Sequence, residues 1–204
     1  MNLTPRESGW FARARHCLSL SDTAAKYAAV EAFLRDAEAG LLEHDEREPV
    51  EPIRAPGRPE RPQLIDPAKV PRRRLGSAAG RAALVHAVAH IEFNAINLAL
   101  DAIYRFRGMP ADYYRDWLSV AHDEARHFLM VAGRLHELGQ AYGDFPAHNG
   151  LWEMAEKTAD SCLERMALVP RVLEARGLDV TPGMMERLAQ VGDHETVSVL
   201  EVIL

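Results

Sequence analysis

Apolar residues recur at helical spacing through most of this chain, and the pattern predicts helices. Repeats of three or four positions, bounded by glycine, proline and capping residues, are typical of amphipathic helices. Long helices joined by short turns favour an all-α antiparallel bundle. The predicted helices cover residues 22–39, 77–107, 111–139, 151–176 with a kink at Pro170, 183–190, and a last segment that opens at Gly192-Asp193 and runs to Leu204.

A proline-rich segment separates the first predicted helix from the others. Seven prolines lie between Pro49 and Pro71, and each disfavours helix at its own position and the one before it. Arginines are interspersed there and continue into Arg72-Arg73-Arg74. A solvated linker is the favoured interpretation of these charges, and an RNA-contacting strip is the alternative. The predicted organisation is therefore an N-terminal helical segment at 1–48, an extended Pro/Arg-rich linker at 49–76 and a bundle at 77–204.

Ionisable residues interrupt the apolar faces of the two longest predicted helices. Glu92 lies within the apolar stripe of 77–107, and Glu124 and His127 lie within that of 111–139. A buried carboxylate is costly unless a proton, a cation or a metal neutralises it. The turn at Gly108 lies roughly 15 residues from both glutamates, so antiparallel packing brings them to a similar height.

Glu124 and His127 form a Glu-x-x-His step, which places a carboxylate and an imidazole on one helix face. Bundle proteins that bind two iron or manganese ions combine this step with glutamates from other helices. The sequence therefore predicts a carboxylate–histidine metal site with Glu92, Glu124 and His127 as ligands.

Two structural alternatives apply to the same residues. Glu92 could be a buried carboxylate paired with Arg105 or Arg126, and His127 could be a hydrogen-bonded core histidine. His86 and His90 have the i, i+4 spacing of metal ligands. The two histidines do not both lie on the apolar stripe that contains Glu92, so we expect a supporting or solvent-facing role for them.

Composition limits the classes of partner. The net charge is -6, and 26% of the residues are charged. This net charge gives no reason to expect binding to nucleic acid or to an anionic membrane. No stretch approaches the roughly 20 apolar residues of a membrane span, and the N-terminus is too polar for a secretory signal. Cys17 and Cys162 lie in unrelated contexts, as free thiols in a reducing compartment do. A cytoplasmic protein without a membrane partner is expected.

Three segments then suggest a family. They are His90-Ile-Glu-Phe-Asn-Ala-Ile-Asn97, Asp123-Glu-Ala-Arg-His127 and the stretch from Arg165 to Asp179. With them, nearly the whole chain resembles a bacterial ferritin-like family long catalogued as a domain of unknown function. That family is similar to the diiron tRNA hydroxylases, which oxidise an isopentenyl-type modified adenosine. The resemblance implies a ferritin-like four-helix bundle with an extra N-terminal helix, and a non-haem diiron carboxylate oxidoreductase that activates oxygen.

The resemblance also extends the site. The string Glu174-Ala175-Arg176 matches the third-helix glutamate of the hydroxylases, so Glu174 becomes the fourth ligand, with Glu153 as the alternative. His90 and Asp123 are expected to orient the ligands. The family pattern also requires a second Glu-x-x-His in the last helix, which this sequence lacks, although that helix contains Glu195 and Glu201. We therefore expect that the last helix is truncated and that half of the site is missing.

The cofactor implied is iron, two ions in a complete family site, with manganese as the alternative metal. A modified tRNA is the candidate substrate, and an electron donor and a second copy of the chain are candidate partners. No catalytic residue is assigned. The alternative function is a ferritin-like protein without turnover, which either binds metal or has lost it and acts as a scaffold.

Overall fold

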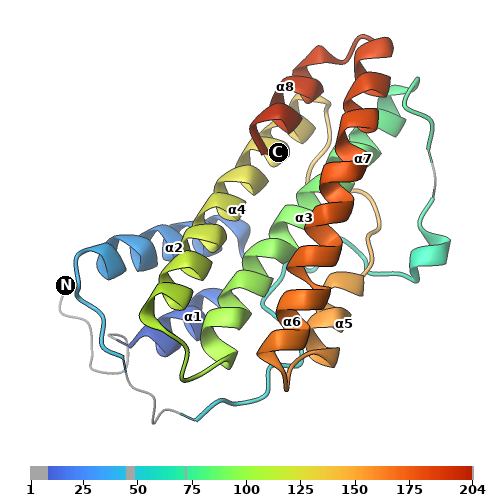
Figure 1. The fold of residues 1–204 in the computed structure, drawn as a ribbon. Coiled ribbons are helices and arrows are strands. Elements are labelled where there is room, and N and C mark those ends of the chain that lie inside the picture. The colour runs from blue at the N-terminus through green and yellow to red at the C-terminus, as the bar shows by residue number, and fades with distance from the viewer. Residues whose placement is uncertain (1–8, 45–48, 72, 204) are drawn as a thin grey trace. The chain divides into compact units, whose positions relative to one another are not determined.

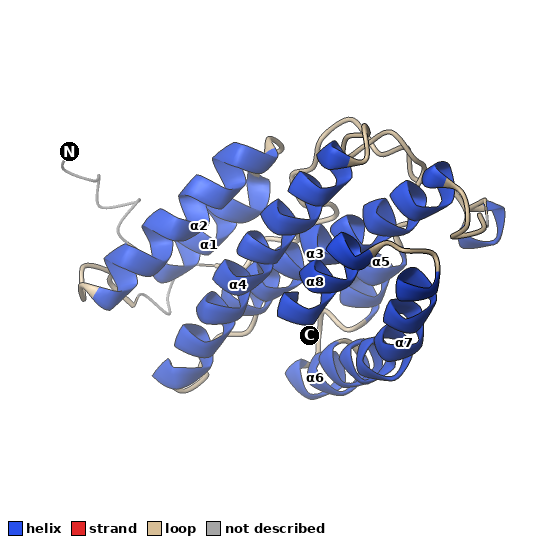
Figure 2. Cartoon of the chain, turned by 90° about the horizontal axis from the view of Figure 1, so that it is seen from above, coloured by secondary structure: helices blue, strands red, loops and turns tan. Residues whose placement is uncertain are grey.

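A computed structural model describes residues 9–44, 49–71 and 73–203, and describes residues 170–179 by their backbone alone. All regular elements in these ranges are helices (Figures 1 and 2), so the prediction of an all-α fold is confirmed. Arg72 and Leu204 lie outside the described residues. The elements are α1 (Trp10–Ser19), α2 (Thr23–Glu38), the 3₁₀ helix η1 (Pro67–Lys69), α3 (Ala78–Arg105), α4 (Ala111–Glu137), α5 (Gly150–Lys157), α6 (Cys162–Leu168), α7 (Pro170–Gln190) and α8 (His194–Ile203).

Helices α3 and α4 agree closely with the predictions of 77–107 and 111–139. A short turn connects them, and Gly108 adopts a positive φ of 70° there, a conformation that glycine takes without steric cost. Pro110 directly precedes α4 and fits the start of a helix because it lacks an N–H group. The antiparallel pair follows from this turn and from the long apolar stripes on either side of it.

The region predicted as a single helix at 151–176 is divided into α5, α6 and the start of α7. The prediction is wrong here because Ser161 caps a new helix, with its side chain accepting a hydrogen bond from the Glu164 N–H. Helix α7 then continues through Pro182 to Gln190, where the sequence predicted a separate short helix at 183–190. Helix α1 was not predicted.

Helix α3 is long and apolar enough to cross a membrane by length and composition. This property differs from the sequence-based prediction that no stretch is apolar enough for a membrane span. However, 67% of its most apolar window is buried inside the protein. The core helix of a globular protein has the same property, so this helix gives only weak support for a membrane span.

The chain forms two compact units, and both long helices contribute to each of them. The first unit contains Met1–Pro59 and Phe93–Arg126. In it, Asp22 caps α2 by accepting from the Ala25 N–H, and Arg13 of α1 forms an ion pair with Asp36 of α2. Its apolar core includes the Trp10 and Phe33 rings, whose centroids lie 5.4 Å apart.

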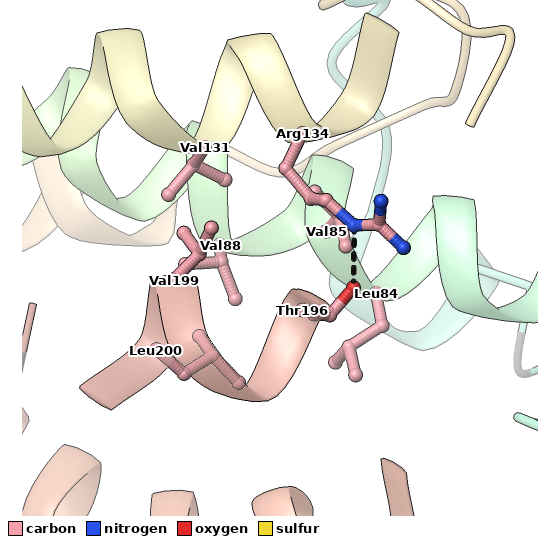
Figure 3. Close-up of a pocket in the computed structure, with 8 residues that line it drawn as sticks. All are labelled: Leu84, Val85, Val88, Val131, Arg134, Thr196, Val199 and Leu200. Atoms are coloured by element: carbon pink, nitrogen blue, oxygen red, sulfur yellow. Dashed lines mark hydrogen bonds between the residues drawn. The ribbon is translucent and has the colours of Figure 1, made fainter. Parts of the chain in front are cut away.

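The second unit contains Glu60–Glu92 and His127–Leu204. Backbone hydrogen bonds of Gln63 and Ile65 with Ala147 connect the end of the proline-rich segment to the loop between α4 and α5. Helices α7 and α8 form a hairpin at Gly192, whose φ is 79°. Helix α8 packs on α3 and α4 around a small apolar pocket (Figure 3). Its lining residues are Leu84, Val85, Val88, Val131, Arg134, Thr196, Val199 and Leu200.

Candidate metal centre

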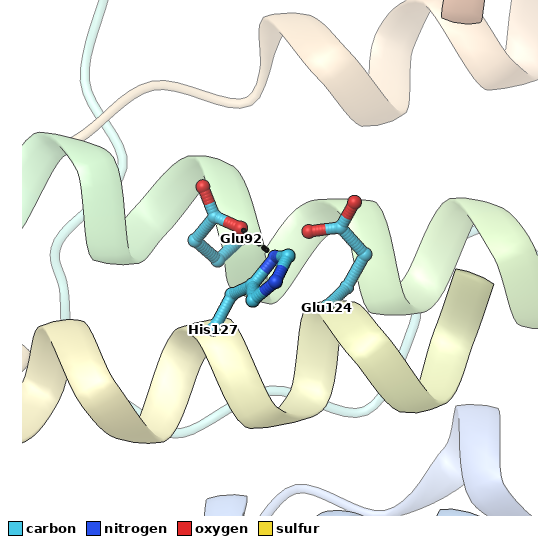
Figure 4. Close-up of side chains that lie close together, drawn as sticks. All are labelled: Glu92, Glu124 and His127. Carbon is cyan, nitrogen blue, oxygen red and sulfur yellow. Dashed lines mark ion pairs between the residues drawn. The ribbon is translucent and has the colours of Figure 1, made fainter. Parts of the chain in front are cut away.

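Glu92, Glu124 and His127 form a cluster of possible metal-binding side chains (Figure 4). Glu92 extends from α3, while Glu124 and His127 lie one turn apart on the uninterrupted helix α4. Each residue offers one ligand atom, and these atoms all lie within 4.8 Å of one another. The His127 Nδ1 atom lies 3.5 Å from Glu92 Oε2. The structure thus brings together the three residues that the sequence selected, although their role as ligands remains a prediction.

The cluster is largely withdrawn from solvent. The side chain of Glu92 is 12% exposed and that of His127 is 22% exposed. Burial of a carboxylate is unfavourable unless a cation or a hydrogen-bond donor compensates it. An imidazole beside Glu92 supplies part of this compensation when it donates or is protonated, and a metal ion would supply it more completely.

Both alternative partners of Glu92 bind an aspartate on their own helix. Arg105 donates to Asp101 one turn before it, with a shortest N–O distance of 2.7 Å. Arg126 donates to Asp123 at 3.3 Å on the exposed face of α4. His127 Nδ1 lies 3.5 Å from Glu92 Oε2, and this contact is an ion pair when the imidazole is protonated.

The residues expected to orient the ligands have other neighbours. Asp123 contacts Arg126 at the surface and lies 4.0 Å from the His122 ring. Both ring nitrogens of His90 form hydrogen bonds of 2.9 Å, Nδ1 with the Tyr142 hydroxyl and Nε2 with the His148 carbonyl. The roles of Asp123 and His90 in orienting the ligands remain predictions.

The remaining candidate glutamates are dispersed. Glu174 belongs to α7, but its side chain lies outside the described part of the chain. Glu153 is exposed on α5, and Glu195 and Glu201 are exposed on α8. The fourth ligand, predicted as Glu174 with Glu153 as the alternative, remains a prediction.

His86 and His90, for which a supporting or solvent-facing role was expected, are both buried on α3. His86 is 1% exposed, and its Nε2 accepts a hydrogen bond of 3.0 Å from the Gly143 N–H. Burial and, to a smaller extent, the neighbouring His90 lower the pKa of His86 to about 4. His86 also stacks on Tyr142, at 5.3 Å between ring centroids. The histidine pair thus fixes the loop after α4 to the side of α3, a contact with no local sequence signal.

Comparison with known proteins places the chain in a family. A family model described as "Protein of unknown function (DUF455)" matches residues 19–204. The chain belongs to this DUF455 family. It is similar to an uncharacterised protein from Haemophilus influenzae, 53% identical over 153 residues, which cover 72% of this chain and 53% of the relative. The chain thus spans about half the length of that relative. No solved structure matches the chain.

Proposed function

We propose that this chain binds iron through Glu92, Glu124 and His127 and that it is a non-haem diiron carboxylate oxidoreductase. The observation that supports the proposal most directly is the convergence of two carboxylates and an imidazole within 4.8 Å on the facing sides of α3 and α4. Oxygen and nitrogen donors of this kind suit iron and manganese, which bundle proteins bind through glutamates and Glu-x-x-His steps.

The donor set fits a single ion without rearrangement of the helices. Ligand atoms on one metal lie about 2 Å from it and therefore about 3–4 Å from one another. The 3.5 Å between His127 Nδ1 and Glu92 Oε2 lies in this range. Small rotations of the Glu124 side chain would complete the approach, because it precedes His127 by one turn of the same helix. Bound iron would supply redox chemistry with oxygen.

The protein's own contribution is to hold the donors and to limit access by water. The helices fix the relative height of Glu92 and His127, and apolar side chains such as Val88 and Val131 lie one turn farther along the same faces. Exclusion of water strengthens electrostatic interactions at the site and protects reactive species from side reactions. These are the properties expected of an oxidation site. The proposal also includes the resemblance to the tRNA hydroxylases.

Metal content tests the proposal. The chain is loaded anaerobically with iron(II), desalted and analysed for metal, beside Glu92→Gln, Glu124→Ala and His127→Ala. We expect about one iron per chain from the three donors, and about two if further ligands complete the site. Each substitution should reduce the content at least about tenfold. His136→Ala is the matched control, because His136 is exposed on the same helix and should not affect loading.

Oxygen consumption by the loaded chain, coupled to substrate oxidation, would separate an oxidoreductase from a metal-binding protein without turnover. Wild-type loading equal to that of the three variants would contradict metal binding at this cluster and favour the scaffold alternative.

A further inference from the structure

Helix α8 begins at a buried cluster of charged groups that the proposed metal site does not use. Asp193, directly before α8, has a side chain that is 3% exposed. Its Oδ1 accepts from Arg134 Nη2 at 2.8 Å, and Arg134 Nε donates to the Thr196 hydroxyl at 3.0 Å. The Arg81 guanidinium of α3 approaches Asp193 Oδ2 at 3.4 Å. One arginine of α4 therefore holds both the cap and the first turn of α8.

The electrostatics of this cluster favour its charged form. Burial by itself would raise the pKa of Asp193, but hydrogen bonds from Thr196 and Arg134 outweigh burial and lower it. Burial would likewise lower the pKa of Arg134, but its hydrogen bonds with Glu137 and Asp193 raise it. Asp193 also caps α8, because its Oδ1 accepts from the Thr196 N–H at 3.1 Å. The contacts between Arg134, Asp193 and Thr196 are called the α8 clasp below.

The clasp sets the register of α8 along the groove between α3 and α4 (Figure 3). Thr196 lies beside Arg134, and one turn later Val199 and Leu200 lie beside Val88 and Val131. Helix α8 therefore runs in the same direction as α3 and opposite to α4.

The next turn brings α8 to the candidate metal centre. Glu92 follows Val88 by four residues on α3, and His127 precedes Val131 by four residues on α4. The equivalent step of about one helical turn along α8 leads from Leu200 to Ile203. By this register, the last turn of α8 lies at the height of Glu92 and His127.

We propose that Arg134 is a positioning residue for this site: through the α8 clasp it holds α8 over the groove of Glu92 and His127 and so limits the access of solvent and the exit of a bound metal. The exit of metal rests on the proposed function, whereas the shielding of His127 does not. Without Arg134, Asp193 would retain the Thr196 N–H and the longer contact to Arg81, and local opening of α8 would become more frequent.

A metal-free experiment tests the shielding. The rate at which diethylpyrocarbonate modifies His127 is measured by mass spectrometry in the wild type and in Arg134→Met, with exposed His136 as the internal reference. We expect the rate at His127, relative to His136, to rise about tenfold in the variant at temperatures well below its unfolding transition. A general loss of stability would not change this ratio in a chain that remains folded.

Two further variants define the contacts responsible. Thr196→Val removes one hydrogen bond of the clasp and should raise the rate about threefold, so it carries the test if Arg134→Met does not fold. Glu137→Gln is the matched control, because Glu137 binds Arg134 from the exposed side at 2.8 Å and does not contact α8 through this pair. It should leave the rate at His127 unchanged.

A second readout addresses the metal. Iron extraction by a chelator should be about tenfold faster from Arg134→Met than from the wild type, with equal iron content at saturation. A chain that binds no iron but shows the His127 effect would refute the proposed function and support the positioning role. Equal His127 rates in the wild type, Arg134→Met and Thr196→Val, with all three chains folded, would overturn the positioning role.

Discussion

Two buried carboxylates in the α3–α4–α8 region have different surroundings. Asp193 has a side chain that is 3% exposed, and it meets two guanidinium groups and the Thr196 N–H in the first turn of α8. Glu92 has a side chain that is 12% exposed, and it meets the imidazole of His127 with a second carboxylate, that of Glu124, nearby. The first arrangement pairs a negative charge with permanent positive charges. The second gathers donor atoms of the kind that a metal ion would share.

This difference distinguishes a carboxylate that is buried for structural stability from one that is buried for ligand binding. A buried ion pair is costly to break, because either partner alone is an uncompensated charge. A cluster of two carboxylates and an imidazole is stabilised mainly by what binds to it. Substitutions at the first site should therefore affect folding, and substitutions at the second should affect ligand binding.

The largest effect on stability is expected for Asp193→Ala. The substitution leaves Arg134 and Arg81 without their shared carboxylate and removes the cap of α8. We expect a loss of about 3–5 kcal/mol in the free energy of unfolding. Urea denaturation monitored by circular dichroism measures it. A loss below about 1 kcal/mol would show that the cluster contributes little and would remove the contrast with Glu92.

The next largest effect on stability is expected for substitution of Lys26, whose buried side chain lies in the first unit. Its Nζ donates to the Cys17 and Leu18 carbonyls and to Asn97 Oδ1, at 2.8–3.1 Å. Burial lowers the pKa of Lys26 to about 7, from the ordinary value of 10.5. Between these values the unfolded chain holds a proton that the folded chain has lost, so stability rises with pH in this window.

The wild type should therefore gain about 3–4 kcal/mol between pH 7 and pH 10 relative to Lys26→Met, in parallel urea titrations. If the free energy of unfolding changes equally with pH in the two proteins, the three oxygen acceptors keep Lys26 protonated throughout this range.

His86 should give a slightly smaller effect, in acid. The pKa of His86 is lowered to about 4 in the folded chain, below the usual 6.5, so the unfolded chain takes up a proton first as pH falls. Stability due to neutral His86 is complete above pH 6.5 and is lost towards pH 4. We expect the wild type to lose about 3 kcal/mol more than His86→Gln between pH 7 and pH 4. The glutamine oxygen can accept from the Gly143 N–H without titrating, so matching curves would exclude His86 as the cause.

The sequence predicted the elements whose signals are local and periodic. Helices α3 and α4 were found to within about two residues, because continuous apolar stripes end at Gly108 and Pro110. The last helix was predicted to open at Gly192-Asp193, and in the structure Asp193 caps it. The division of 151–176 also had a signal, since Ser161 and Glu164 have the spacing of a capping box, but the apolar pattern outweighed it.

Long-range contacts were not accessible in this way. Glu92, Glu124 and His127 could be selected because each interrupts an apolar face at a height set by one turn. Arg134 could not, because its partners Asp193 and Thr196 are about 60 residues away and belong to a helix whose register only packing determines. The same holds for His90 and its partners in the loop after α4.

The smallest effect on the metal-free chain is expected for Glu92→Leu, at the opposite extreme from Asp193→Ala. Leucine has a similar volume and needs no compensating charge, so removal of this buried carboxylate should change the free energy of unfolding by no more than about 1 kcal/mol and could increase it. Iron should then stabilise the wild type but not Glu92→Leu. A ligand at about 100 times its dissociation constant stabilises the wild type by about 2.7 kcal/mol, and Glu92→Leu should lose this increment.

Thermal unfolding with and without iron(II) under anaerobic conditions measures both quantities on the same samples. A loss of about 3 kcal/mol or more without metal would make Glu92 a structural carboxylate like Asp193. A small change without metal and a lost increment with it would mean that Glu92 is buried for binding, because its burial then has a stabilising effect only when the ion is present.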